Sequence, residues 1–231
     1  MNIYALIPLI AAIAYIPLFV ILLLNRPWDR KQKLFFVFLV AAILWSLTDF
    51  LGRSDWFMPY KLVLVKVVLC AAMWMGIQVH YLFSSYYQTR RVKIPLAYIF
   101  PISIIILAAL GYVPESLQIG AGAIQVKYGI PFVLLAVGGS SIIVRDVCLL
   151  VQRVRVSPGP VERNQIAYLF ASLFVLLGFG FASFVQIGYK LTIAHLGSLG
   201  MACILTYAIV AHRLLDVRVA LRRALMYLGI Y

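Results

Sequence analysis

Long apolar runs, separated by short polar stretches, form the dominant pattern along this chain. A membrane-spanning helix needs about 20 mostly apolar residues. Seven segments meet this requirement and are predicted to be transmembrane helices: residues 3–24, 34–51, 60–83, 94–113, 128–152, 165–188 and 191–212. The second segment is short, so its helix could begin a turn earlier. The pattern therefore predicts an all-α membrane protein, a bundle of seven transmembrane helices.

The connections between these segments differ in basic charge. Fourteen lysines and arginines follow the first, third, fifth and seventh segments, whereas four lie in the other connections. The fourteen are Arg26, Arg30, Lys31, Lys33, Arg90, Arg91, Lys93, Arg153, Arg155, Arg163, Arg213, Arg218, Arg222 and Arg223, and the four are Arg53, Lys61, Lys127 and Lys190. Because cytoplasmic connections carry the excess of positive charge, we predict an outside N-terminus and a cytoplasmic C-terminus. This alternation requires an odd number of spans.

The composition agrees with a membrane protein. Hydrophobic residues make up 65% of the chain and charged residues 12%, and the mean hydropathy is +1.02. A soluble domain is about half apolar and a quarter charged. No polar stretch among the 231 residues is long enough for a soluble domain. We therefore expect a multi-pass protein of the plasma (inner) membrane, with a seven-helix transmembrane domain at 1–212 and a cytoplasmic or juxtamembrane segment at 213–231.

Two shorter tracts need a separate interpretation. The longest polar external connection, PESLQIGAGAIQVK (114–127), contains glycines that suit a flexible lid or loop. The final stretch 224–231 is apolar and too short to span a membrane. Either the chain is truncated there, or this stretch lies in the membrane interface.

Charge and motifs exclude several function classes. The net charge of +13 would favour nucleic-acid binding in a soluble protein. Here topology and anionic lipid headgroups account for it, so no nucleic-acid partner is expected. Cys70, Cys148 and Cys203 lie in apolar runs without metal-ligand spacing, so no disulfide framework, metal site or cofactor is predicted. The common hydrolase, metalloprotease and nucleotide-binding motifs do not occur, so no catalytic residue is assigned and no enzyme is expected.

Ionisable residues inside membrane-spanning segments are costly and mark candidate functional sites. Asp49 lies near the outer end of the second segment, one helical turn after Trp45 and on the same face. Lys66 lies in the outer half of the third segment, and His195 lies near the outer end of the seventh. We assign these four residues as the candidate site for a polar ligand that enters from outside. In the alternative, Lys66 extends toward the membrane surface, and Asp49 merely pairs with it or with Arg53.

Two adjacent ionisable residues, Arg145 and Asp146, lie near the cytoplasmic end of the fifth segment. Neighbours on a helix point about 100° apart, so these two cannot simply neutralise each other. Asp146 either meets a neighbouring arginine or belongs to a cytoplasmic latch that opens on signalling. On the seventh segment, four residues recur at helical spacing and predict a small polar stripe facing the bundle interior: His195, Ser198, Ala202 and Thr206.

Three tracts carry a resemblance to a known family: ILWSLTDFLGRS (43–54), ERNQIAYLF (162–170) and LGSLGMACILTYAIVAHRLLDVRVALRRAL (196–225). The third is the most specific, especially Tyr207-Ala208-Ile209 followed by His212-Arg213-Leu214-Leu215-Asp216. Over nearly its whole length the chain resembles the N-terminal seven-transmembrane region, a receptor or input domain, of bacterial sensor histidine kinases. The resemblance implies a receptor that senses a ligand or the state of the membrane, and whose last helix drives a cytoplasmic output module.

The resemblance also implies how a signal leaves the membrane. The arginine-rich tract after the seventh segment would be the coupling segment, and we assign coupling roles to Arg145, Asp146, Arg213 and Asp216. The implied partners are an extracellular or membrane-borne ligand, a cytoplasmic signalling domain or protein, anionic lipid headgroups, and a second copy of the chain in a homodimer. No phospho-accepting histidine segment or ATP-binding domain occurs in this chain, so the resemblance transfers neither catalysis nor binding residues.

Two other function classes stay open. A small-molecule transporter or permease subunit would use the same outer cluster as a substrate site, although no repeated half or matching pair of broken helices is visible. A membrane anchor or assembly partner would co-purify with another protein. The leading prediction is a membrane signal-sensing input domain of a histidine-kinase-type system, with no catalytic domain in this chain.

Overall fold

The structure, a computed structural model, describes residues 5–24, 30–87, 96–120, 123–127, 129–155, 160–183 and 192–209. Arg213 and Asp216, to which the sequence assigns coupling roles, lie outside these described residues.

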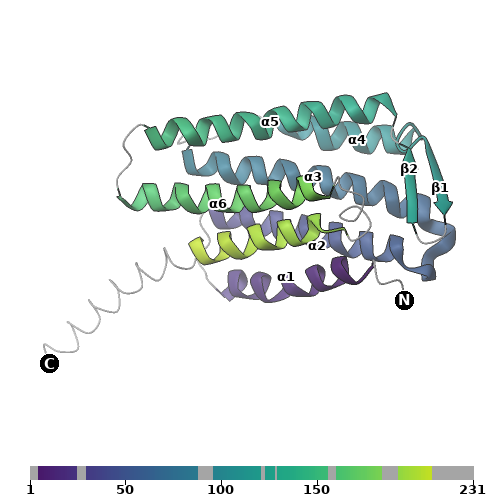
Figure 1. The fold of residues 1–231 in the computed structure, drawn as a ribbon, viewed down its shortest axis with the longest axis horizontal. Coiled ribbons are helices and arrows are strands. Elements are labelled where there is room, and N and C mark those ends of the chain that lie inside the picture. The colour runs from purple at the N-terminus through teal and green to yellow at the C-terminus, as the bar shows by residue number, and fades with distance from the viewer. Residues whose placement is uncertain are drawn as a thin grey trace, which may run out of the picture.

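Seven α-helices in the described part of the chain lie side by side and run in alternating directions (Figure 1). They are α1 (Leu6–Leu24), α2 (Arg30–Arg53), α3 (Lys61–Tyr87), α4 (Ile99–Ala109), α5 (Ile130–Arg155), α6 (Pro160–Ala182) and the helix Ala194–Ile209, called here the last described helix. Two short 3-10 helices, η2 (Asp55–Tyr60) and η3 (Leu96–Tyr98), precede α3 and α4. The helical fold that the apolar runs predict is confirmed.

A two-stranded hairpin is added to the helices where the sequence suggested a flexible lid or loop. Strands β1 (Ser116–Gly120) and β2 (Ala123–Lys127) pair antiparallel. In this register Leu117 lies opposite Val126, and Ile119 lies opposite Ile124. The hairpin marks one end of the bundle, called here the hairpin end, where α2 also finishes (Figure 1).

Helix bounds differ most from the prediction in the fourth apolar segment. The sequence predicts a helix over 94–113, but α4 covers only Ile99–Ala109. Gly111 has a φ of +85°, a conformation that commonly ends a helix. The N–H of Tyr112 donates to the carbonyl of Leu107 at 2.9 Å and closes the last turn. By contrast, α2 begins a turn before its predicted start, as its short apolar segment allowed.

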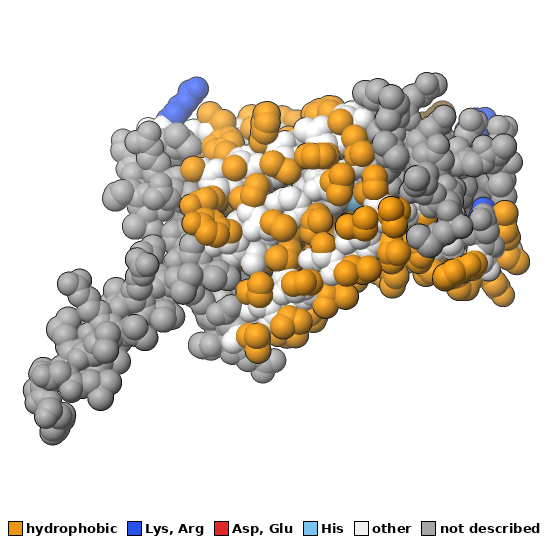
Figure 2. Space-filling model, turned by 60° about the horizontal axis from the view of Figure 1, so that its bottom comes forward, with side chains coloured by type: hydrophobic (Ala, Val, Ile, Leu, Met, Phe, Trp, Pro, Cys, Tyr) orange, Lys and Arg blue, Asp and Glu red, His pale blue; other side chains and the backbone are white. Residues whose placement is uncertain are grey.

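Within the described ranges, four helices are long and apolar enough to cross a membrane: Leu6–Leu24, Arg30–Arg53, Trp56–Ser85 and Ile130–Gln152. The apolar helices Leu96–Ala109, Ile166–Ala182 and Ala194–Ile209 are shorter. Hydrophobic side chains are spread over the whole described surface in Figure 2, and the visible Lys and Arg side chains lie toward its two ends. Such a surface is unfavourable in water and suits a hydrocarbon environment.

Exposed aromatic side chains gather at the hairpin end. Trp56 and Tyr60 of η2 are both more than half exposed, and so is Tyr112 beyond α4. Trp and Tyr are enriched where a bilayer meets water, because their rings are apolar and their N–H or O–H groups are polar. The hairpin end is therefore suited to a membrane–water boundary.

The bundle core is centred on α2, which packs against α1 and α3. Phe35, Phe38 and Leu39 of α2 are fully buried. Met201 and Leu205 of the last described helix are fully buried in the same hydrophobic cluster. The last described helix is therefore part of the central packing.

Candidate functional site

An imidazole is enclosed between α2 and the last described helix. His195 is 1% exposed, and its ring stacks on the indole of Trp45 with ring centroids 3.8 Å apart. Its Nε2–H donates to Oδ2 of Asp49 at 3.0 Å, and its Nδ1 lies 3.0 Å from Oγ of Ser46. In a neutral imidazole with its proton on Nε2, Nδ1 accepts a hydrogen bond from the Ser46 hydroxyl. Both ring nitrogens therefore have partners, as a buried polar group requires.

One face of α2 carries all of these partners. Trp45, Asp49 and Arg53 follow one another at intervals of four residues, so they lie along a single stripe of the helix. Nε of Arg53 donates to both carboxylate oxygens of Asp49 at 3.1 Å. The side chains of Arg53 and Asp49 are 23% and 13% exposed. The Asp49 carboxylate therefore joins a partly exposed guanidinium to the buried ring of His195.

A pair of hydroxyl groups extends the connection to α1. The Ser198 hydroxyl donates to the backbone carbonyl of His195 at 3.0 Å. A serine hydroxyl has one proton, so at its 2.7 Å contact with Tyr15 the serine accepts and the tyrosine donates. Tyr15 and Ser198 are both fully buried. Seven residues thus form one connected set, called here the hairpin-end network: Tyr15, Trp45, Ser46, Asp49, Arg53, His195 and Ser198.

Asp49, His195 and Ser46 are connected in the order of a catalytic triad, but their arrangement does not suit nucleophilic catalysis. A nucleophile needs room for the reacting atom of a substrate about 3 Å away. Ser46 is fully buried, and its hydroxyl is directed at His195. The network is better suited to holding three helices in one arrangement than to turning over a substrate.

The structure brings together three of the four residues assigned to the outer ligand site. Trp45, Asp49 and His195 are in direct contact. Lys66 is half-buried on α3, and no hydrogen bond or ion pair among the described residues connects it to the other three. Asp49 instead pairs with Arg53, as the alternative interpretation of the sequence allowed. The predicted polar stripe is buried as expected, since His195, Ser198, Ala202 and Thr206 are all buried.

A second buried polar pair joins α3 to α5. Nδ1–H of His80 donates to the Asp146 carboxylate, whose two oxygens lie 2.9 and 3.0 Å away. Both side chains are buried, whereas the adjacent Arg145 is exposed. Arg145 and Asp146 thus point in different directions, as their adjacency predicts. The sequence interpretation missed the contact with His80. The available signal was that helix alternation places His80 and Asp146 near the same end of neighbouring apolar segments.

Further polar and aromatic groups lie around this pair. The Tyr81 ring is 5.1 Å from the His80 ring and stacks on the Tyr98 ring at 5.2 Å. The Gln78 amide nitrogen donates to the Tyr98 hydroxyl. The Gln78 amide oxygen is buried without a hydrogen-bond partner among the described residues. These groups tie α3 to η3 beside the α3–α5 contact.

Glycines let the last described helix pack closely against α6. A Cβ at Gly197 would lie 2.6 Å from Cβ of Phe179, and a Cβ at Gly200 would lie 2.8 Å from Cγ1 of Val175. Neither distance is compatible with an undisturbed side chain. The last described helix is therefore held from three sides, by α1 and α2 through the hairpin-end network and by α6 through these glycines.

No group of three or more His, Cys, Asp or Glu side chains within the described ranges could hold a metal ion. Comparison with models of protein families and with curated protein sequences found no match to this chain.

Proposed function

We propose that this chain is the membrane signal-sensing input domain of a histidine-kinase-type signalling system. It would be a seven-transmembrane receptor of the bacterial plasma membrane, with its N-terminus outside and its C-terminus in the cytoplasm. The proposal is supported by the resemblance of the tracts 43–54, 162–170 and 196–225 to such input domains. The structural observation that carries it is the hairpin-end network.

The network makes the position of the last described helix depend on the part of α2 at the hairpin end. Ionisable groups in an apolar bundle are costly unless they are paired. His195 is the second residue of the last described helix, and Asp49 lies one turn before the end of α2. Because each of these residues supplies the other's hydrogen bond, the favourable position of either helix depends on the position of the other.

A signal needs two arrangements of the bundle, one of which the stimulus favours. Arg53 and Asp49 are the partly exposed members of the network, so a polar ligand at the hairpin end would meet them first. A ligand that drew Asp49 away from the bundle would leave the His195 Nε2–H without its acceptor. The last described helix would then adopt a second position and pass this change to the arginine-rich tract that follows it.

A fusion protein tests this proposal. The full chain is joined after Tyr231 to the phosphotransfer and ATP-binding regions of a histidine kinase, and autophosphorylation is measured in inverted membrane vesicles. We expect Asp49→Asn and His195→Phe to change the rate about fivefold or more, the usual lower range of coupling between sites. Lys66→Ala, outside the network, should leave the rate unchanged.

Two results would count against the receptor. Wild-type rates for both network variants would mean that the network does not control the output. Saturable uptake of a small solute by liposomes containing the unfused chain, lost in Asp49→Asn, would favour a permease instead.

A further inference from the structure

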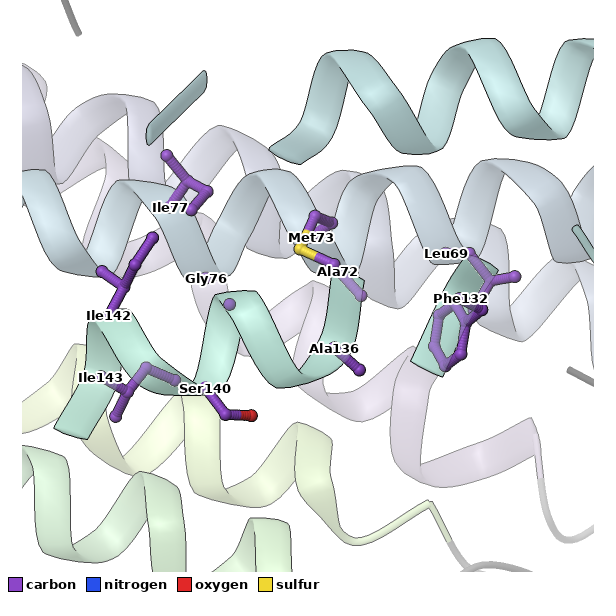
Figure 3. A pocket seen from close by; sticks show the side chains of 11 residues that line it. Leu69, Ala72, Met73, Gly76, Ile77, Phe132, Ala136, Ser140, Ile142 and Ile143 are labelled. Atoms are coloured by element: carbon purple, nitrogen blue, oxygen red, sulfur yellow. The ribbon is translucent and has the colours of Figure 1, made fainter. Parts of the chain in front are cut away.

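A pocket between α3 and α5 lies apart from the hairpin-end network. It has a volume of about 280 Å³ and is lined by one face of each helix (Figure 3). Among the described residues that line it, Ser140 alone has a polar side chain. An apolar pocket of this kind suits an apolar ligand.

The pocket is elongated. Its lining residues on α3 extend from Leu69 to Ile77, and those on α5 extend from Phe132 to Ile143. At 1.5 Å of rise per residue, these stretches are about 12 and about 16 Å long. Because the lining residues recur at helical spacing, the pocket follows the helices lengthwise. Its shape suits an extended chain better than a compact molecule.

Small residues create the space. A Cβ added to Gly76 would meet no atom within 4 Å, and one added to Gly139 would lie 3.7 Å from the sulfur of Met73. Ala72 and Ala136 line the same pocket. The space is partly open to the surroundings of the bundle, so an apolar group can enter it.

The exposed side chains of α5 indicate which ligand is available to the pocket. Val133, Leu134 and Val137 are each more than half exposed, and α5 is long and apolar enough to cross a membrane. In a bilayer these side chains would contact phospholipid acyl chains, and they are next to the pocket-lining residues Phe132 and Ala136 on the same helix.

We propose that this pocket binds one acyl chain of a bilayer phospholipid, which enters sideways from the membrane. The His80–Asp146 pair lies one helical turn beyond Ile77 and Ile143, so it holds α3 and α5 together at one end of the pocket. The acyl chain therefore acts on the spacing of the two helices that this pair joins. Binding does not depend on the proposed receptor function, although in a receptor it would supply an input from the membrane itself.

The first test measures binding to the purified full chain by native mass spectrometry during titration with phosphatidylethanolamine. The wild-type chain should bind one phospholipid tightly. Gly76→Leu, which fills the pocket, should weaken that binding about tenfold, because the side chain takes the place of buried methylene groups. Gly178→Leu is the matched control, since a Cβ at Gly178 of α6 also meets no atom within 4 Å. If Gly76→Leu does not fold, Ala72→Leu fills the same pocket from α3.

The second test locates the acyl chain. The protein is reconstituted into phosphatidylcholine vesicles in which a photoreactive diazirine lies midway along one acyl chain. After illumination, peptides that contain Met73–Ile77 and 139–143 should be labelled more than the exposed face around Val137, and Gly76→Leu should abolish the difference.

Three outcomes would overturn the inference. The first is equal labelling of the pocket and of the exposed face around Val137. The second is phospholipid binding that stays unchanged in both pocket-filling variants. The third is a purified chain that retains free fatty acid but not phospholipid. The fusion-protein assay is independent of each, so failure of lipid binding and failure of the receptor proposal can be told apart.

Discussion

His195 is stable in an apolar bundle because each polar atom of its ring has a partner. Both partners come from α2, where Ser46 and Asp49 are three residues apart and therefore lie on one face. Removal of one partner would leave a buried donor or acceptor unpaired, which costs more than the hydrogen bond itself contributes. The network should therefore be sensitive to single substitutions.

Asp49→Ala removes the acceptor for both His195 and Arg53. We expect the free energy of unfolding to fall by about 2 kcal/mol, the usual cost of an unpaired buried group. Denaturant titration in detergent micelles, followed by circular dichroism, measures this change. Lys66→Ala serves as the control and should change stability by less than about 0.5 kcal/mol, because Lys66 is outside the network. Equal losses in both variants would contradict the assigned role of Asp49.

The sequence predicted part of this site. Trp45, Asp49 and His195 could be selected because aromatic and ionisable residues in apolar segments are conspicuous. Hydropathy does not encode how each helix is rotated about its axis, so it could not show that Lys66 makes no hydrogen bond or ion pair with the other three. Ser46 and Tyr15 carry no such signal, because hydroxyl groups are common in membrane helices and can bond to their own backbone. Their roles emerge only from the packing.

At the scale of helices, the contact between the last described helix and α6 depends on the absence of side chains at Gly197 and Gly200. Small residues allow helix backbones to approach closely in membranes, where no hydrophobic effect drives helices together. The same two helices supply a built-in comparison, because Gly178 of α6 lies in open space.

Gly197→Ala and Gly178→Ala should therefore have effects of opposite sign. Alanine is favoured over glycine in a helix by about 1 kcal/mol, so Gly178→Ala should raise the free energy of unfolding. At Gly197 the new Cβ would meet Phe179, and overpacking should lower the free energy of unfolding by about 1–3 kcal/mol. Unfolding of both variants in the same detergent measures the two changes in the free energy of unfolding. A stabilised Gly197→Ala would show that the two helices are not in close contact.

The hairpin is an element that the sequence could have predicted more fully. Leu117, Ile119, Ile124 and Val126 alternate with other residues on either side of a short connection, which is the periodicity of paired strands. The glycines of this tract favoured the prediction of a flexible lid or loop instead. The shortness of α4 was harder to foresee, because apolar residues continue beyond Gly111 while the backbone has already left the helix.

At the scale of the whole molecule, the alternation of basic charge predicts which end of the bundle faces the cytoplasm. Lys127 lies at the hairpin end, and Arg155 lies at the opposite end of α5, where the side chains of both are exposed. We expect single cysteines at these two positions to report opposite sides of the membrane. The background would carry alanine at Cys70, Cys148 and Cys203.

A maleimide that cannot cross membranes should label Lys127→Cys on intact cells. It should label Arg155→Cys only after the membrane is permeabilised. The reverse pattern would invert the proposed topology, and labelling of both on intact cells would rule out an α5 that crosses the membrane.

The central claim is that the contact between Asp49 and His195 sets the position of the last described helix. Electron paramagnetic resonance between spin labels at Leu47→Cys and Tyr207→Cys tests it most directly in lipid nanodiscs, since both positions are exposed. We predict one narrow distribution of distances between the two spin labels when all residues of the network are unchanged. Asp49→Asn should add a second population displaced by about 1–2 Å or more, as in other helix shifts that carry signals, while Lys66→Ala should not. An identical narrow distribution in Asp49→Asn would contradict the account.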